Sequence, residues 1–159
     1  MDDADARGGY FAAQGDGEAV APDPSFPHVF TSAAEIPFAD LGEGLRFKPV
    51  FGRNLLLNHV YFAPHAGAPA HRHPEEQMGV VLEGELEFEI AGETRVSRAG
   101  DIWVIPPNAP HSARALENGC VALDIFAPPR SGFREALARV GWTGDPGPGA
   151  SRPASDPMM

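Results

Sequence analysis

Cysteine is nearly absent from this sequence, which has a single thiol, Cys120, in 159 residues. One cysteine excludes an intrachain disulfide, and the apolar run 120–123 around it predicts a buried structural thiol. Long apolar runs are also missing, since no stretch approaches the roughly 20 residues that span a bilayer. The acidic start, residues 1–5, does not resemble a secretion signal, so we expect a cytoplasmic protein without a membrane partner.

Basic residues are scarce as well. Twelve lysines and arginines stand against 22 acidic residues, which gives a formal net charge of −10. A field of this sign repels the phosphates of nucleic acids, so a nucleic-acid partner is disfavoured, and the simplest interpretation of the charge is solubility. The length suits one domain with a core of its own.

Proline and glycine are abundant, with 17 and 18 residues respectively, which leaves little room for long helices and favours short strands joined by tight turns. The segment 85–90 alternates strictly, which puts Leu86, Phe88 and Ile90 on one face. A hairpin turn is predicted at 91–93, and Gly84 is expected to lie in a turn where the strand reverses. The other predicted strands are 55–62, 94–96, 101–105 and 121–126.

Only the segment 133–140 has helical spacing, with Phe133, Leu137 and Val140 on one side. The predicted class is therefore all-β, a barrel or sandwich with one short C-terminal helix. We expect a β-barrel domain over residues 31–140, preceded by a flexible acidic arm at 1–30 and followed by a disordered tail at 141–159. The strand at 101–105 is apolar on both faces after its first residue, which predicts that a second subunit covers one face in a homodimer.

Three of the six histidines are spaced as metal ligands. His71 and His73 share one face of a strand, and Gln77 joins that face if the strand continues after a bend at Pro74. A proline-rich turn then brings His111 to the start of another strand. Exposed histidines without a metal are the alternative, but the two-part pattern favours one divalent ion on His71, His73, Gln77 and His111.

These segments resemble the two motifs of the cupin family. Gly67 begins a near match to the first motif, although three residues rather than five precede His71, and residues 100–111 match the second, G-x5-P-x-[G/N]-x2-H. The resemblance covers about residues 44–130. It implies a double-stranded β-helix, the jelly-roll barrel, of six to eight strands with a metal ion in its mouth.

The third cupin ligand is usually glutamate, and this chain has Gln77 there. Glu76 is adjacent but has the wrong parity to face inward. Four neutral donors would leave the ion its full double charge, which strengthens it as a Lewis acid. The donor set suits Zn, Ni, Mn or Fe and does not rank them.

Asp124 interrupts an apolar strand, where a carboxylate is unfavourable unless it is paired or functional. A carboxylate buried near the ion would serve as a general acid or base, and Arg130 would neutralise an anionic substrate or pair with Asp124. The segment 124–130 and the segment 71–77 are similar to those of KdgF-type cupins, which linearise unsaturated uronates. That resemblance implies that Asp124, Phe126 and Arg130 line an active site.

Together these observations predict a metal-dependent enzyme that carries out isomerase or lyase proton transfer on a small anionic keto or unsaturated sugar acid. Three alternatives use the same pocket. They are an Fe-dependent dioxygenase, a cupin that binds a small molecule without turnover, and a biosynthetic tailoring cupin.

Overall fold

The computed structural model describes residues 21, 23–25 and 29–142. The predicted arm and tail lie almost wholly outside these residues. The described part contains one helix, α2, and eight strands, with the bounds β1 Ala39–Gly42, β2 Leu45–Phe51, β3 Leu56–Phe62, β4 Gly67–His71, β5 Glu76–Ile90, β6 Glu93–Arg98, β7 Ile102–Ile105, β8 His111–Ala127 and α2 Gly132–Arg139. No helix in these residues is long and apolar enough to cross a membrane.

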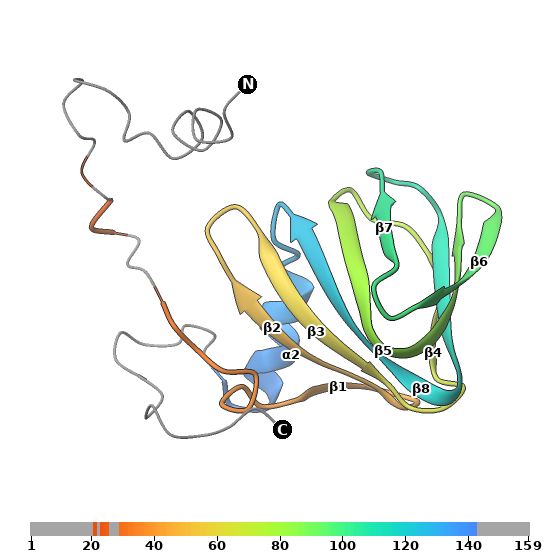
Figure 1. Cartoon of the computed structure of the whole chain (residues 1–159). Helices are drawn as coiled ribbons and strands as arrows, with labels where there is room; N and C mark the ends of the chain where they lie inside the picture. Colours follow the sequence, from red (N-terminus) through yellow and green to blue (C-terminus); the bar gives the residue numbers. More distant parts are fainter. Residues whose placement is uncertain (1–20, 22, 26–28, 143–159) are drawn as a thin grey trace, which may run out of the picture.

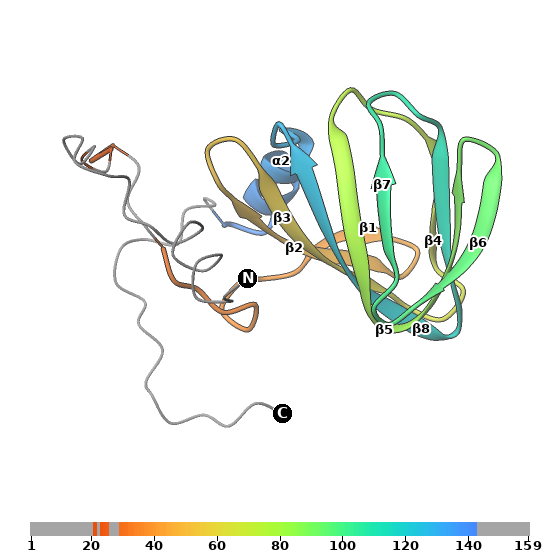
Figure 2. The ribbon, with the colours of Figure 1, turned by 45° about the horizontal axis from the view of Figure 1, so that its top comes forward.

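The strands form the jelly roll that the resemblance to cupins implies, and the predicted all-β class is confirmed. One sheet has the order β1-β2-β3-β8-β5-β7, in which β8 contributes its second half and β5 its first half. The other has the order β4-β8-β5-β6 and uses the remaining halves of the same two strands. The two sheets face each other across the barrel interior, as Figures 1 and 2 show.

The two long strands pass from one sheet to the other at a pair of glycines. Gly84 and Gly119 have φ of 77° and 74°, and a β-carbon on Gly84 would collide with the carbonyl oxygen of Gly119. Only glycine allows both the left-handed backbone and this close approach. The turn expected at Gly84 is therefore wrong, because β5 bends there without reversing and its irregular register with β8 absorbs the bend.

Two apolar clusters stabilise the fold. One fills the barrel and includes Leu86 and Phe88, as the alternation predicts. The other joins β1, β2, β3 and the end of β8 to α2, whose Leu137 is fully buried. Burying this leucine contributes about 2–3 kcal/mol. The predicted helix is present, but Val140 lies at its C-cap and is 46% exposed, so it does not belong to the buried side.

Within one chain, β7 has one covered face. Trp103 and Ile105 point into the barrel and are buried, whereas Ile102 is 70% exposed and Val104 is 53% exposed. Both faces of this strand were expected to be covered, and the chain itself covers one of them.

Cys120 is buried beside the glycine bend, and its strand neighbours are Phe62 on β3 and Gly84 on β5. Burial, together with the nearby Asp124 carboxylate, raises the pKa of its thiol to about 11. The thiol therefore stays protonated at pH 8, where a free cysteine with a pKa near 8.5 is partly ionised.

We expect a disulfide reagent at pH 8 to modify Cys120 in the folded protein at least about 100-fold more slowly than in the protein unfolded in guanidinium chloride, measured by the thiolate that the reagent releases. Rapid stoichiometric reaction of the folded protein would contradict the buried placement.

Candidate metal centre and pocket

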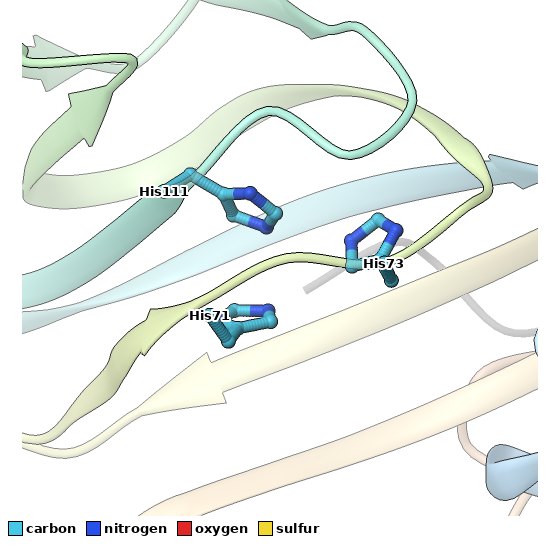
Figure 3. A group of neighbouring side chains, drawn as sticks. All are labelled: His71, His73 and His111. Atoms are coloured by element: carbon cyan, nitrogen blue, oxygen red, sulfur yellow. The ribbon is translucent and has the colours of Figure 1, made fainter.

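Three histidine side chains meet inside the barrel, near its mouth. His71 ends β4 and His111 begins β8, and the two are paired across the strands. His73 lies in the loop between β4 and β5, so the strand does not continue through Pro74 as the parity argument requires. The loop nevertheless turns the His73 side chain inward. The backbone carbonyl of His73 accepts a hydrogen bond from the backbone N–H of Asn108 at 2.8 Å. One ring nitrogen of each histidine lies within 4.8 Å of the others (Figure 3).

Each ring has its proton position fixed by the backbone. The Nδ1 atoms of His71, His73 and His111 lie 2.8, 3.1 and 2.9 Å from carbonyl oxygens, which belong to Pro69, Glu75 and Ala109 respectively. A carbonyl oxygen only accepts, so each Nδ1 carries the proton and donates it. The Nε2 lone pairs are then left free for the space between the rings, which is the arrangement that metal-binding histidines use.

The environment also favours neutral rings. Burial lowers the pKa of His73 and of His111, and the positive charge of Arg130 acts in the same direction on both. The Nε2 atom of His111 is buried and has no hydrogen-bond partner in the part of the chain that the structure describes. A buried lone pair without a donor is unfavourable, and a cation would satisfy it.

Gln77 supplies a fourth donor atom at the same place. Its Nε2 donates to Asp124 Oδ1 at 2.8 Å, which directs its Oε1 toward His73 Nε2 at 3.1 Å. With the proton of His73 on Nδ1, this contact joins two lone pairs and no hydrogen. Such a contact is repulsive unless a cation lies beside both atoms. The three histidines thus fit a divalent metal site, and Gln77 faces that site.

Asp124 occupies the inner face of β8, between Asn58 of β3 and Gly79 of β5. A β-carbon on Gly79 would lie 2.7 Å from Asp124 Oδ1 and 2.5 Å from Cζ2 of Trp103, so only glycine leaves room for both side chains. Burial raises the pKa of Asp124 to about 6, against the opposing effects of Gln77, Trp103 and Arg130. The carboxylate is therefore held close to the histidine cluster in an environment that favours proton exchange near neutral pH.

Phe126 and Arg130 form the wall beside this carboxylate. Phe126 is buried, and its ring centre lies 5.6 Å from that of His73. The Arg130 guanidinium lies 5.4 Å from the Phe126 ring centre and 5.5 Å from that of Phe133 on α2. The helix that follows the barrel thus helps to hold Arg130 over the mouth.

Glu75 is a charged residue of the site that the sequence analysis did not single out. Its Oε2 lies 3.3 Å from His73 Nδ1 and 3.8 Å from Arg130 Nε. Glu75 lies two residues from His73 and two from Gln77, so it has the same strand parity as these residues, and this parity was the available signal. The loop conformation that turns it inward is not periodic, so that signal alone does not place it.

The site opens through two connected spaces. An inner pocket of about 100 Å³ is lined by His71, Gln77, His111, Asp124 and apolar side chains of both sheets. A wider cleft of about 690 Å³ lies outside it and is bordered by Glu75, Arg130 and Phe133. Residues His71, Arg130 and Phe133 line both spaces, so the inner pocket is reached through the cleft.

Comparison with known proteins agrees with this architecture. A family described as Cupin domain matches residues 58–126, a range that includes the three histidines, Gln77 and Asp124. Pectin degradation protein KdgF of Dickeya dadantii (strain 3937) is 34% identical over 101 residues, which cover 62% of this chain and 92% of that protein.

Two further proteins are similar to this chain over parts of different length. H2HPP isomerase of Bacillus subtilis is 37% identical over 67 residues, which are 41% of this chain and 28% of that protein. The solved structure of KdgF from Halomonas sp. has a TM-score of 0.64 and 31% identity, and it covers 67% of this chain and 99% of that one. The similarity thus extends over nearly the whole length of the two KdgF proteins.

The geometry predicts which histidines hold a metal. His73→Ala and His111→Ala should each lower the affinity for a divalent metal by about 10²-fold or more, because each removes an inward Nε2. His65→Asn is the control, since His65 is exposed and has φ 62°, which asparagine tolerates. Metal content measured by elemental analysis after dialysis should fall in the first two variants and stay unchanged in the control. Retention of stoichiometric metal by both alanine variants would exclude this site.

Proposed function

Since this chain belongs to the cupin family, we propose that it is a metal-dependent isomerase of small, anionic unsaturated or keto sugar acids. The observation that carries the proposal is the hydrogen bond between Gln77 and Asp124, which holds a carboxylate against the histidine cluster. The similarity to a pectin degradation protein and to an isomerase supports the same reaction class.

His71, His73, Gln77 and His111 would hold the ion, and Zn, Ni, Mn and Fe all suit this set of nitrogen and oxygen donors. With four neutral ligands, a bound divalent ion supplies Lewis acidity toward a carboxylate or carbonyl oxygen of the substrate. The side chains of this chain do the remaining work.

Asp124 is the proposed proton-transfer group. Opening a cyclic enol ether takes a proton from its hemiacetal hydroxyl group, which becomes an aldehyde as the bond from that carbon to the ring oxygen breaks. The released enol becomes a ketone when a proton is added at the former alkene carbon, so the isomerisation consumes no other reactant. One carboxyl oxygen of Asp124 accepts from Gln77, and the second is left for the substrate. A carboxyl group with a pKa near 6 both gives and takes a proton at neutral pH without a large free-energy difference.

Arg130 and Phe126 would orient the substrate. The Arg130 guanidinium borders both the pocket and the cleft, where it can pair with a substrate carboxylate. Glu75 lies on its other side, at 3.8 Å, and keeps the guanidinium near the mouth when no substrate is bound. Phe126 closes the wall beside His73 and excludes water from the reacting atoms.

The catalytic assignment is tested with unsaturated uronates, whose ring opening removes their ultraviolet absorbance. Asp124→Asn should lower the rate by about 10²–10⁴, the usual share of general acid–base catalysis. The variant should keep its metal, since the new amide oxygen still accepts from Gln77. Arg130→Ala should raise KM more than it lowers kcat, because an anion contact acts in both ground and transition states.

Arg134→Ala serves as the control for Arg130, because Arg134 lies on α2, the helix that follows Arg130, stacks on Phe51 and is not among the residues that line the pocket or the cleft. An unchanged absorbance with metal-loaded wild type would reject uronates as substrates. Full activity of Asp124→Asn would instead remove Asp124 from the mechanism. Oxygen consumption by the Fe-loaded protein would favour a dioxygenase.

We also propose that the protein is a homodimer. The outer face of the first sheet presents neighbouring apolar side chains in cross-strand rows, among them Ile102, Val104 and Met78, which are 70%, 53% and 40% exposed. Met78 continues the row to Ile125 of β8, which pairs with Leu57 of β3. A flat apolar face of this kind is suited to the same face of a second copy.

Lysines at this face should separate the subunits. Ile102→Lys combined with Val104→Lys introduces charges that burial at an interface would not tolerate, so the variant should run as a monomer in light scattering while the wild type runs as a dimer. Val96→Lys changes an exposed valine on β6, in the other sheet, and should leave the dimer intact. A monomeric wild type at micromolar concentration would contradict the proposal.

A further inference from the structure

Two buried polar atoms in the inner pocket have no role in the histidine cluster. Among the described residues, neither Asn58 Oδ1 nor Trp103 Nε1 has a hydrogen-bond partner, and both residues line the pocket. Asn58 is 1% exposed and Trp103 is 6% exposed, so bulk water does not solvate their side chains freely. A buried polar atom without a partner destabilises a fold, and natural structures retain such atoms mainly where a ligand or a water satisfies them.

The register of the sheet places these two residues on either side of Asp124. Asn58 is the neighbour of Asp124 on β3, and Gly79 is its neighbour on β5. Trp103 is in turn the neighbour of Gly79, and its ring occupies the space that a side chain at Gly79 would fill. The indole N–H lies near enough to the Asp124 carboxylate to favour its ionised form, but it does not reach the geometry of a full hydrogen bond.

We propose that Asn58 and Trp103 form an inner subsite that selects a hydroxylated substrate by binding its oxygen atoms on both sides of Asp124. This inference rests on the proposed function and deepens it, because it assigns residues to substrate selection. It concerns the inner end of the pocket, opposite to the anion contact at Arg130.

The chemistry of the two atoms defines what the subsite accepts. Asn58 Oδ1 is an acceptor and needs a donor, which a small acid without nitrogen provides only as a hydroxyl group. Trp103 Nε1 is a donor and needs an acceptor, which any hydroxyl or carbonyl oxygen provides. A ring or chain with several hydroxyl groups satisfies both atoms, whereas a hydrocarbon ring leaves both unpaired. Sites that contain buried polar groups reject ligands without the matching group strongly.

Binding of two unreactive acids tests the subsite. D-Galacturonate and cyclohexanecarboxylate both carry a carboxylate on a six-membered ring, but only the first has hydroxyl groups. Calorimetry on the metal-loaded wild type should show a preference for D-galacturonate. Asn58→Leu should lower the affinity for D-galacturonate by about tenfold, since leucine has a similar size and no polar atom. The affinity for cyclohexanecarboxylate should stay unchanged or rise. Trp103→Phe should act in the same direction.

Thermal stability gives a second readout. If Asn58 is kept for a ligand, Asn58→Leu removes an unsatisfied buried atom and should raise the Tm of the ligand-free protein by about 2–4 °C. Asn118→Leu, at an exposed position of β8, and Trp142→Phe, at the other tryptophan, are the matched controls and should leave the preference between the two acids unchanged.

Three results would overturn the subsite. They are a wild type without a preference for D-galacturonate, equal weakening of both acids in Asn58→Leu, and a fall in Tm for that variant, which would indicate a structural role for Asn58. The outcome is separable from that of the proposed function. Failure of the uronate assay together with an intact, Asn58-dependent preference would reject the reaction and keep the subsite, and turnover without the preference would do the reverse.

Discussion

β5 and β8 pair along almost their whole length, from Glu76 opposite Ala127 to Ile90 opposite His111. Because the two strands belong to both sheets, their pairing closes the barrel and sets the position of everything inside it. Gln77 and Asp124 lie near one end of this pair and His111 lies at the other. The bend at Gly84 and Gly119 then turns the two ends toward the same interior, so that donors far apart along one strand meet at one point.

The site combines neutral histidine donors with two acidic side chains that lie beside them. The histidine rings are held neutral by burial and by their Nδ1 contacts with carbonyl oxygens. Asp124 and Glu75 lie next to the cluster without being its inward donors, and each senses the charge of Arg130. Neither carboxylate belongs to the three-histidine cluster, so a divalent ion held there would keep its effective charge.

Much of this arrangement is written locally in the sequence. The alternation of 85–90 gives the strand and its buried face, and a lone aspartate in the apolar strand around Asp124 marks a polar interior position. The spacing of His71, His73 and His111 predicts that they meet, although His73 reaches the cluster from a loop and not from the strand that the parity argument requires. What the sequence does not give is geometry that depends on two distant segments at once. Gly84 alone predicts a turn, and only its contact with Gly119 shows that the strand bends there and continues.

The same limit applies to the inner end of the pocket. Trp103 has the pattern of a core aromatic, and only the neighbouring strand reveals that its indole nitrogen is left without a partner. Glu75 likewise belongs to a loop, where no period predicts the direction of a side chain. The fold class and the three histidines that fit a metal site follow from sequence pattern, whereas the polar lining of the pocket follows from packing across strands.

The missing side chain at Gly79 has a consequence for how this pocket can change over evolutionary time. A β-carbon at position 79 would lie 2.5 Å from the carbonyl oxygen of Leu123, 2.5 Å from the indole ring of Trp103 and 2.7 Å from the Asp124 carboxylate. The first of these atoms belongs to the backbone of β8, so a smaller residue at position 103 would not by itself make room for a side chain at 79. Any side chain at position 79 therefore requires β5 and β8 to move apart. The shape of the inner pocket can change through residue 103, whereas residue 79 is fixed by the pairing of the two strands that close the barrel.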